Sequence, residues 1–73
     1  MTKLTMENAT PHQKEFVALY AADVRSYPEC YETSVMALPE AAALRLVKGL
    51  NDAEVAVLIW DLKEERRRVI EEG

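Results

Sequence analysis

Apolar residues recur at three- and four-residue spacing through most of the chain, which is the spacing of amphipathic helices. The first such stretch places Phe16, Val17, Tyr20, Val24 and Tyr27 on one face and leaves charged residues, including Asp23, to the others. Proline stands at positions 11, 28 and 39, where a helix can begin without losing a hydrogen bond. The pattern predicts an all-α fold without a sheet, with helices near residues 11–26, 28–37, 39–48 and 52–71.

Residues near the helix ends support these boundaries. Thr10 followed by Gln13 is typical of a capping box, and Asn51 followed by Glu54 predicts a second one. Gly49 suits the left-handed residue that ends a helix, so we expect the third helix to stop there. Both ends of the turn between the third and fourth helices are therefore specified locally.

The fourth helix is apolar around most of its circumference between positions 55 and 62, so we expect it to be the central and most enclosed helix. Trp60 lies opposite Ile59 and Leu62, and forms either a second wall of the core or an anchor for a partner. The residues expected in the core are Phe16, Tyr20, Val24, Tyr31, Val35, Leu44, Val47, Val55, Leu58, Ile59 and Leu62.

The chain has 73 residues, of which 49% are hydrophobic, so it can form one small folded domain. Residues 1–9 lack helical periodicity, and we expect a mobile N-terminal arm there. Residues 10–73 form the expected domain, a compact bundle of four short helices. An arm that becomes ordered on a partner would involve its Lys3, Leu4 and Met6.

The net charge is −4, which makes a duplex DNA partner unlikely because affinity for phosphate comes mainly from lysine and arginine. A single cysteine, Cys30, permits no intramolecular disulfide, and no apolar run is long enough to span a bilayer. We therefore expect a cytoplasmic protein with protein partners and no membrane association.

The residues that usually carry chemistry are too few to predict an enzyme. His12 is the only histidine and belongs to an expected exposed helical turn, while Cys30 has no second cysteine with which to hold a metal. We expect His12 to be solvated and Cys30 to be a half-buried, inert thiol. The sequence thus predicts no catalytic residue, no metal and no cofactor.

Arg66, Arg67 and Arg68 follow one another in the polar end of the fourth helix. Such a run is either a salt-bridged helix surface or a basic ridge directed at an acidic protein surface or at RNA. Because these residues lie beyond the expected core, we expect the fold to make little use of them. Together with Trp60, they are the main candidates for partner binding.

Residues 41–62 also follow the pattern of a helix-turn-helix, with Gly49 in the turn. Asp52 and Glu54 would, however, lie at the start of the recognition helix, where side chains meet bases and phosphates. A corner between two helices that serves packing alone explains the same residues.

A resemblance to a known family is carried in particular by residues 10–20 (TPHQKEFVALY) and 37–68 (ALPEAAALRLVKGLNDAEVAVLIWDLKEERRR). The chain as a whole resembles the small transcription regulators of Xanthomonas-infecting phages. These proteins act on host RNA polymerase. The resemblance implies binding near the RNA exit channel, at the N-terminus of the largest subunit and the neighbouring flap, with possible contact to nascent RNA. It also implies inhibition of sigma-dependent promoter recognition, and antitermination at intrinsic terminators.

Two other classes fit the same residues. One is a helix-turn-helix regulator that binds DNA, and the other is a small protein-interaction module of the antitoxin kind. Recovery of polymerase subunits from a bacterial lysate, salt-sensitive retardation of DNA, or capture of one unrelated protein would distinguish the three.

Overall fold

The computed structural model describes residues 3–72, and within this range the chain is helical and has no strand. The elements are α1 (Pro11–Ser26), a single 3-10 turn η1 (Pro28–Cys30), α2 (Thr33–Ala37), α3 (Pro39–Val47) and α4 (Asp52–Glu72). The all-α bundle predicted from the sequence is confirmed, and three of the four expected helices have nearly the expected bounds.

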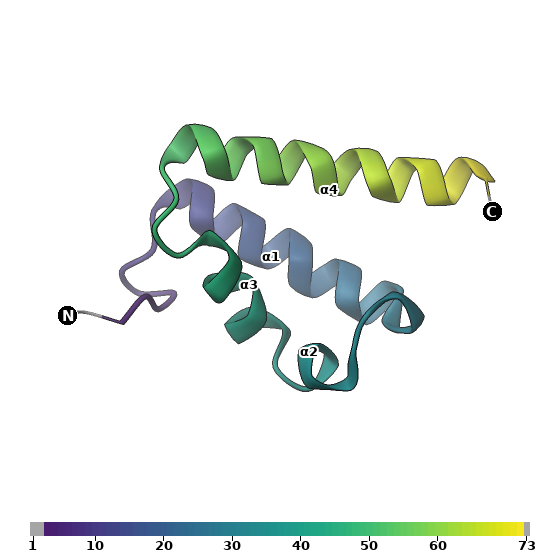
Figure 1. Ribbon diagram of the computed structural model, residues 1–73, viewed down its shortest axis with the longest axis horizontal. Helices are drawn as coiled ribbons and strands as arrows, with labels where there is room; N and C mark the ends of the chain where they lie inside the picture. Colours follow the sequence, from purple (N-terminus) through teal and green to yellow (C-terminus); the bar gives the residue numbers. More distant parts are fainter. Residues whose placement is uncertain (1–2, 73) are drawn as a thin grey trace.

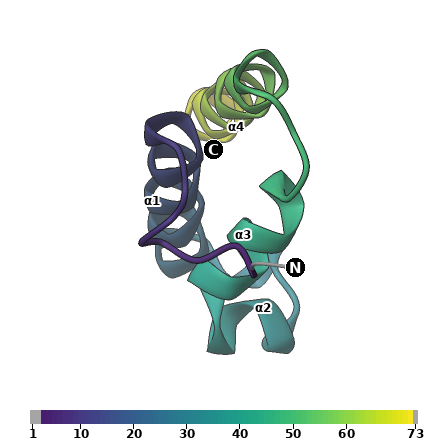
Figure 2. The same cartoon turned by 90° about the vertical axis from the view of Figure 1, so that its left-hand side faces the viewer.

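Helix α1 is the element against which the others pack. It lies between α4 on one side and α3 on the other, and it contacts both (Figure 1). Helices α1 and α4 run side by side in the same direction, whereas α3 returns in the opposite direction. Viewed from the end, α3 and α4 cover different sides of α1 (Figure 2).

The helix ends follow the signals in the sequence. The Thr10 hydroxyl accepts a hydrogen bond from the Gln13 amide at 3.1 Å, and the Gln13 side chain accepts one from the Thr10 amide at 2.9 Å. Asn51 and Glu54 make the same reciprocal pair at the start of α4, at 2.9 and 3.1 Å. Gly49 has a φ of 79°, the left-handed conformation expected after α3.

The expected helix over residues 28–37 is wrong in its middle. It consists of the 3-10 turn η1 and the five-residue α2, separated by extended backbone at Tyr31 (φ −128°, ψ 153°). The extended conformation lets the Tyr31 ring pack edge-on against Tyr20 at a centroid distance of 5.4 Å. Its hydroxyl donates a hydrogen bond to Asp23. Contacts to α1 thus replace the local hydrogen bonds that would have continued a helix.

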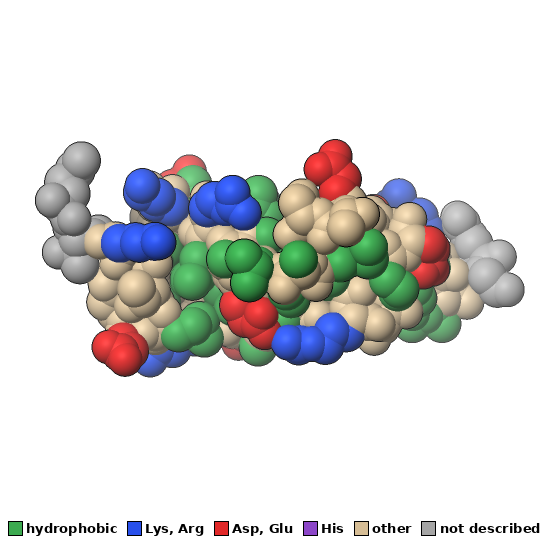
Figure 3. All heavy atoms as spheres, turned by 90° about the horizontal axis from the view of Figure 1, so that it is seen from below, with side chains coloured by type: hydrophobic (Ala, Val, Ile, Leu, Met, Phe, Trp, Pro, Cys, Tyr) green, Lys and Arg blue, Asp and Glu red, His purple; other side chains and the backbone are tan. Residues whose placement is uncertain are grey.

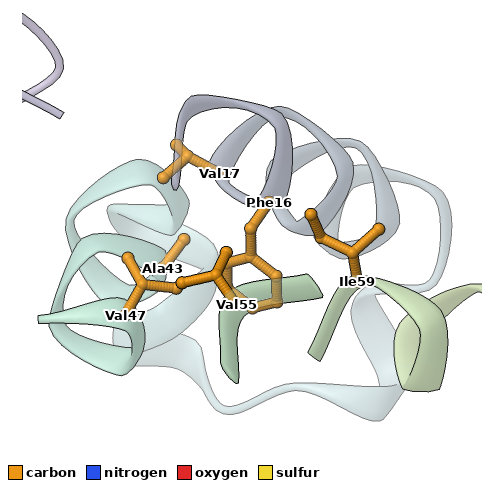
Figure 4. Close-up of a cluster of buried hydrophobic side chains, with 6 residues drawn as sticks. All are labelled: Phe16, Val17, Ala43, Val47, Val55 and Ile59. Atoms are coloured by element: carbon orange, nitrogen blue, oxygen red, sulfur yellow. The ribbon is translucent and has the colours of Figure 1, made fainter. Parts of the chain in front are cut away.

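The core lies where α1, α3 and α4 meet, and its side chains point toward one another (Figure 4). Half-buried Leu44, Leu58 and Leu62 pack around it, as Tyr20 does. Ala42 and Ala43 are buried as well, because α3 approaches α1 through its small side chains. The central cluster consists of Phe16, Val17, Ala43, Val47, Val55 and Ile59.

The prediction that the fourth helix is the most enclosed is wrong. Among the residues of α4 up to position 71, only Val55 and Ile59 are buried, whereas Val57 is 58% exposed and Trp60 is 62% exposed. In so small a bundle α4 has one neighbour along most of its length, so only one stripe of its apolar surface can be covered. Trp60 is therefore not a second wall of the core.

The described part of the N-terminal arm, residues 3–9, forms no helix and passes across α3 toward the start of α1 (Figure 2). Leu4 packs against the core cluster and Ala9 is buried. The Asn8 side chain accepts a hydrogen bond from the Thr5 amide and donates one to the Lys3 carbonyl. The Asn8 hydrogen bonds fold the arm on itself, whereas Leu4 and Ala9 are its contacts with the bundle.

Candidate functional site

Two large apolar side chains stand in solvent on the side of α4 that faces away from α1. Val57 and Trp60 lie three residues apart, and Glu64 and Arg67 continue the same face at the next turns. We call these four residues the outer face of α4. A tryptophan that is 62% exposed buries little apolar area within the chain itself. Packing of the fold therefore does not explain why a tryptophan stands at position 60.

The expectation that the fold makes little use of the three arginines is wrong for Arg66. Its Nε donates a hydrogen bond to Asp23 Oδ1 at 2.8 Å, and a terminal nitrogen donates to the Leu19 carbonyl at 3.3 Å. Asp23 is only 8% exposed, so it does not project away from the core as expected. Its burial follows from its pairing, since a carboxylate is rarely buried without a cation.

Arg67 and Arg68 remain exposed, as the sequence predicted. Arg67 forms ion pairs with Glu71 at 3.3 Å and Glu64 at 4.0 Å along its own helix. The continuous ridge of three arginines therefore does not exist. Arg67 joins the outer face of α4, while Arg66 belongs to the interface between α1 and α4.

The arm residues proposed for partner binding lie at the opposite end of the molecule. Lys3 and Leu4 line a hollow of about 330 Å³ with Arg45 of α3 and Lys48, the residue that follows α3. Lysine and arginine side chains gather at this end of the face seen in Figure 3. Met6 is 38% exposed. The structure thus separates these arm residues from Trp60. Arg45 and Lys48 were not predicted as site residues, although their spacing of three in the sequence places two cations close together.

A groove lies between the C-terminal halves of α1 and α4, with a volume of about 290 Å³. Its apolar walls come from Leu58, Leu62 and Val69 of α4, and Asp61, Glu65 and Arg66 contribute charge. Cys30 of η1 also lines it, together with Asp23. We call it the aromatic groove, after its four rings: Phe16, Tyr20, Tyr27 and Tyr31.

A polar network fixes the base of this groove. Asp23 accepts hydrogen bonds from both Arg66 and the Tyr31 hydroxyl. Burial, the hydrogen bond to Asp23 and the nearby negative charges raise the pKa of Tyr31 above its ordinary value. Burial and the charge of Asp23 also raise the pKa of Tyr20. Both phenols are therefore neutral throughout the physiological range, and the Tyr31 hydroxyl can keep donating its hydrogen bond to Asp23.

The side chains that most often carry catalysis are dispersed. His12 is exposed, as expected, with its Nδ1 3.8 Å from a carboxylate oxygen of Asp52. Cys30 is exposed and not half-buried as expected; it lies in the short turn η1, of which no residue is buried. Among the described residues, no group of three or more histidine, cysteine, aspartate or glutamate side chains could hold a metal ion.

The helices within residues 3–72 are too short or too polar to cross a bilayer. Comparison of the chain with protein-family models, with curated proteins and with solved structures gave no match. The surfaces described above are therefore the basis for proposals about its function.

Proposed function

We propose that this chain is a non-enzymatic regulator that binds bacterial RNA polymerase through the outer face of α4. In this proposal it disfavours sigma-dependent promoter recognition on free polymerase and makes the elongating enzyme read through intrinsic terminators. The resemblance of residues 10–20 and 37–68 to small phage regulators supplies the partner. The observation that supports binding by α4 is the exposure of Trp60 beside Val57.

Exposed tryptophan and arginine are the side chains that most often dominate the energy of a protein interface. Trp60 and Arg67 share the outer face, seven residues and about two helical turns apart. The intervening Glu64 pairs with Arg67 and keeps its guanidinium over this face. A partner surface with an apolar pocket and a nearby acid would therefore fit the outer face of α4.

The net charge of −4 supports a partner surface with a positive potential, because complementary charge steers encounter and fixes orientation. The entrance to an RNA exit channel is such a surface, since it holds a polyanion. The hollow lined by Lys3, Arg45 and Lys48 could meet nascent RNA at the other end of the molecule.

A binding assay with purified polymerase core enzyme tests the proposal. The wild-type chain, immobilised through an N-terminal tag, should retain the core enzyme, and Trp60→Ala should lose at least about tenfold in affinity. Leu38→Ala is the matched control, because Leu38 is equally exposed at 64% but lies between α2 and α3. Equal retention by all three proteins, or none by the wild type, would refute binding through α4.

A DNA retardation assay separates the main alternative. Asp52 and Glu54 are exposed in the first turn of α4, where a recognition helix would approach phosphates. We therefore expect no retardation of duplex DNA at physiological salt. Retardation that weakens steeply with salt would favour the helix-turn-helix alternative instead.

A further inference from the structure

The aromatic groove lies outside the surface assigned to polymerase above, and its lining has a recognisable chemistry. We propose that it binds an arginine side chain presented by a partner protein. This inference rests on the proposed protein-binding function and adds a second contact to it. Size, aromatic lining and charge each support it.

The size of the groove suits one long side chain. Its volume of about 290 Å³ is just below the roughly 300–1,000 Å³ of pockets that hold small molecules. Leu58, Leu62 and Val69 form an apolar wall along which the methylene stem of an arginine can lie. The guanidinium would then reach the aromatic side of the groove.

The rings are held in position before any ligand arrives. Tyr20 stands between Phe16, at a centroid distance of 5.6 Å, and Tyr31, at 5.4 Å. Tyr31 is fixed in turn by its hydrogen bond to Asp23. A planar guanidinium stacks on such rings and is attracted by their π electrons.

The charges of the groove favour a cation. Asp23 is already paired with Arg66, so these two charges offset each other. Asp61 and Glu65 are exposed, lie one helical turn apart, and form no ion pair with another described residue. Two carboxylates at this spacing repel each other, and a cation placed between them relieves that repulsion.

An NMR titration with a short peptide tests the proposal without polymerase. Acetyl-Gly-Arg-Gly-amide is added to the ¹⁵N-labelled full chain at low salt, and acetyl-Gly-citrulline-Gly-amide, which has the same shape without the charge, serves as the control. We expect the arginine peptide to shift the amides of residues 27, 29–31 and 61–69. Its dissociation constant should be at least about tenfold lower than that of the citrulline peptide.

Equal binding of the citrulline peptide would overturn the requirement for a cation. Equal binding of a norleucine peptide would show an apolar slot and would also overturn it. Shifts confined to other residues would remove the groove from consideration. Because no polymerase is present, these outcomes are distinguishable from a failure of the function proposed above.

Charge variants separate specific recognition from general attraction to an acidic protein. Asp61→Asn combined with Glu65→Gln should raise the dissociation constant at least about fivefold. Glu64→Gln with Glu71→Gln removes the same charge from α4 outside the groove and should change it less than about twofold. Equal weakening by both pairs would contradict the proposal. The amide spectrum of each variant reports whether its fold is intact.

Discussion

Arg66 of α4 donates a hydrogen bond to Asp23 of α1 at 2.8 Å, which joins residues 43 positions apart in the chain. This pair ties together the C-terminal halves of the two long helices, beyond the apolar cluster that holds their N-terminal halves. It also fixes Tyr31 through the second oxygen of Asp23. The base of the aromatic groove therefore depends on one ion pair.

Arg66→Gln should lower the free energy of unfolding by about 1–3 kcal/mol, because it leaves the buried Asp23 carboxylate without its cation. The loss is smaller than for a fully buried pair, since the Arg66 side chain is 28% exposed. Arg68→Gln, on the exposed side of α4, should change stability by less than about 0.5 kcal/mol. Urea denaturation of both variants checks this. Equal stability of the two would show that the ion pair contributes nothing.

Two valines of α4 test which face of the helix is buried. Val55 is 0% exposed and Val57 is 58% exposed. Val55→Ala should cost about 1–3 kcal/mol through lost burial and a small cavity, whereas Val57→Ala should cost less than about 0.5 kcal/mol. Thermal unfolding followed by circular dichroism measures both. A larger loss for Val57 than for Val55 would mean that α4 is rotated relative to this account.

The raised pKa of Tyr31 predicts a loss of stability in alkali. A phenol whose pKa is higher in the folded chain contributes its full stabilisation below its unfolded pKa of about 10 and loses it as pH rises through the folded value. The free energy of unfolding should therefore begin to fall at about pH 10 and keep falling as the pH rises toward the folded pKa, more steeply in the wild type than in Tyr31→Phe. Denaturant titrations across this range give the two slopes. Identical slopes would show that Tyr31 does not couple ionisation to folding.

Much of the fold could be predicted from local signals. The pairs Thr10 with Gln13 and Asn51 with Glu54 act within one helical turn, so their effect is visible in the sequence. Gly49 is similar, because its φ of 79° is a property of one residue. These positions set the ends of α1, α3 and α4.

The errors concern relations between distant residues. Asp23 was assigned to the surface because its partner Arg66 is far away in sequence. The sequence left two positions open for Trp60, in the core or at a partner surface, because α4 is apolar on several sides and periodicity does not say which side another helix will cover. The break at Tyr31 arises from its contacts with Tyr20 and Asp23 on α1, which override the helical tendency of residues 28–37.

In the candidate sites, too, local features could be predicted from the sequence and contacts between distant residues could not. The exposure of Arg67 and Arg68 was predictable from the polar end of α4, but the inward turn of Arg66 was not. The aromatic groove combines residues of α1, η1 and α4, and no stretch of sequence contains more than a part of it. Lys3 likewise joins Arg45 and Lys48 only through the path of the arm across α3.

The most direct test of the account is terminator read-through in a purified transcription system with bacterial RNA polymerase. The wild-type chain and Leu38→Ala should both produce read-through at an intrinsic terminator. Trp60→Ala, with native helical circular dichroism, should require at least about tenfold more protein for the same effect. Full read-through by folded Trp60→Ala at the wild-type concentration would contradict the claim that the outer face of α4 binds polymerase.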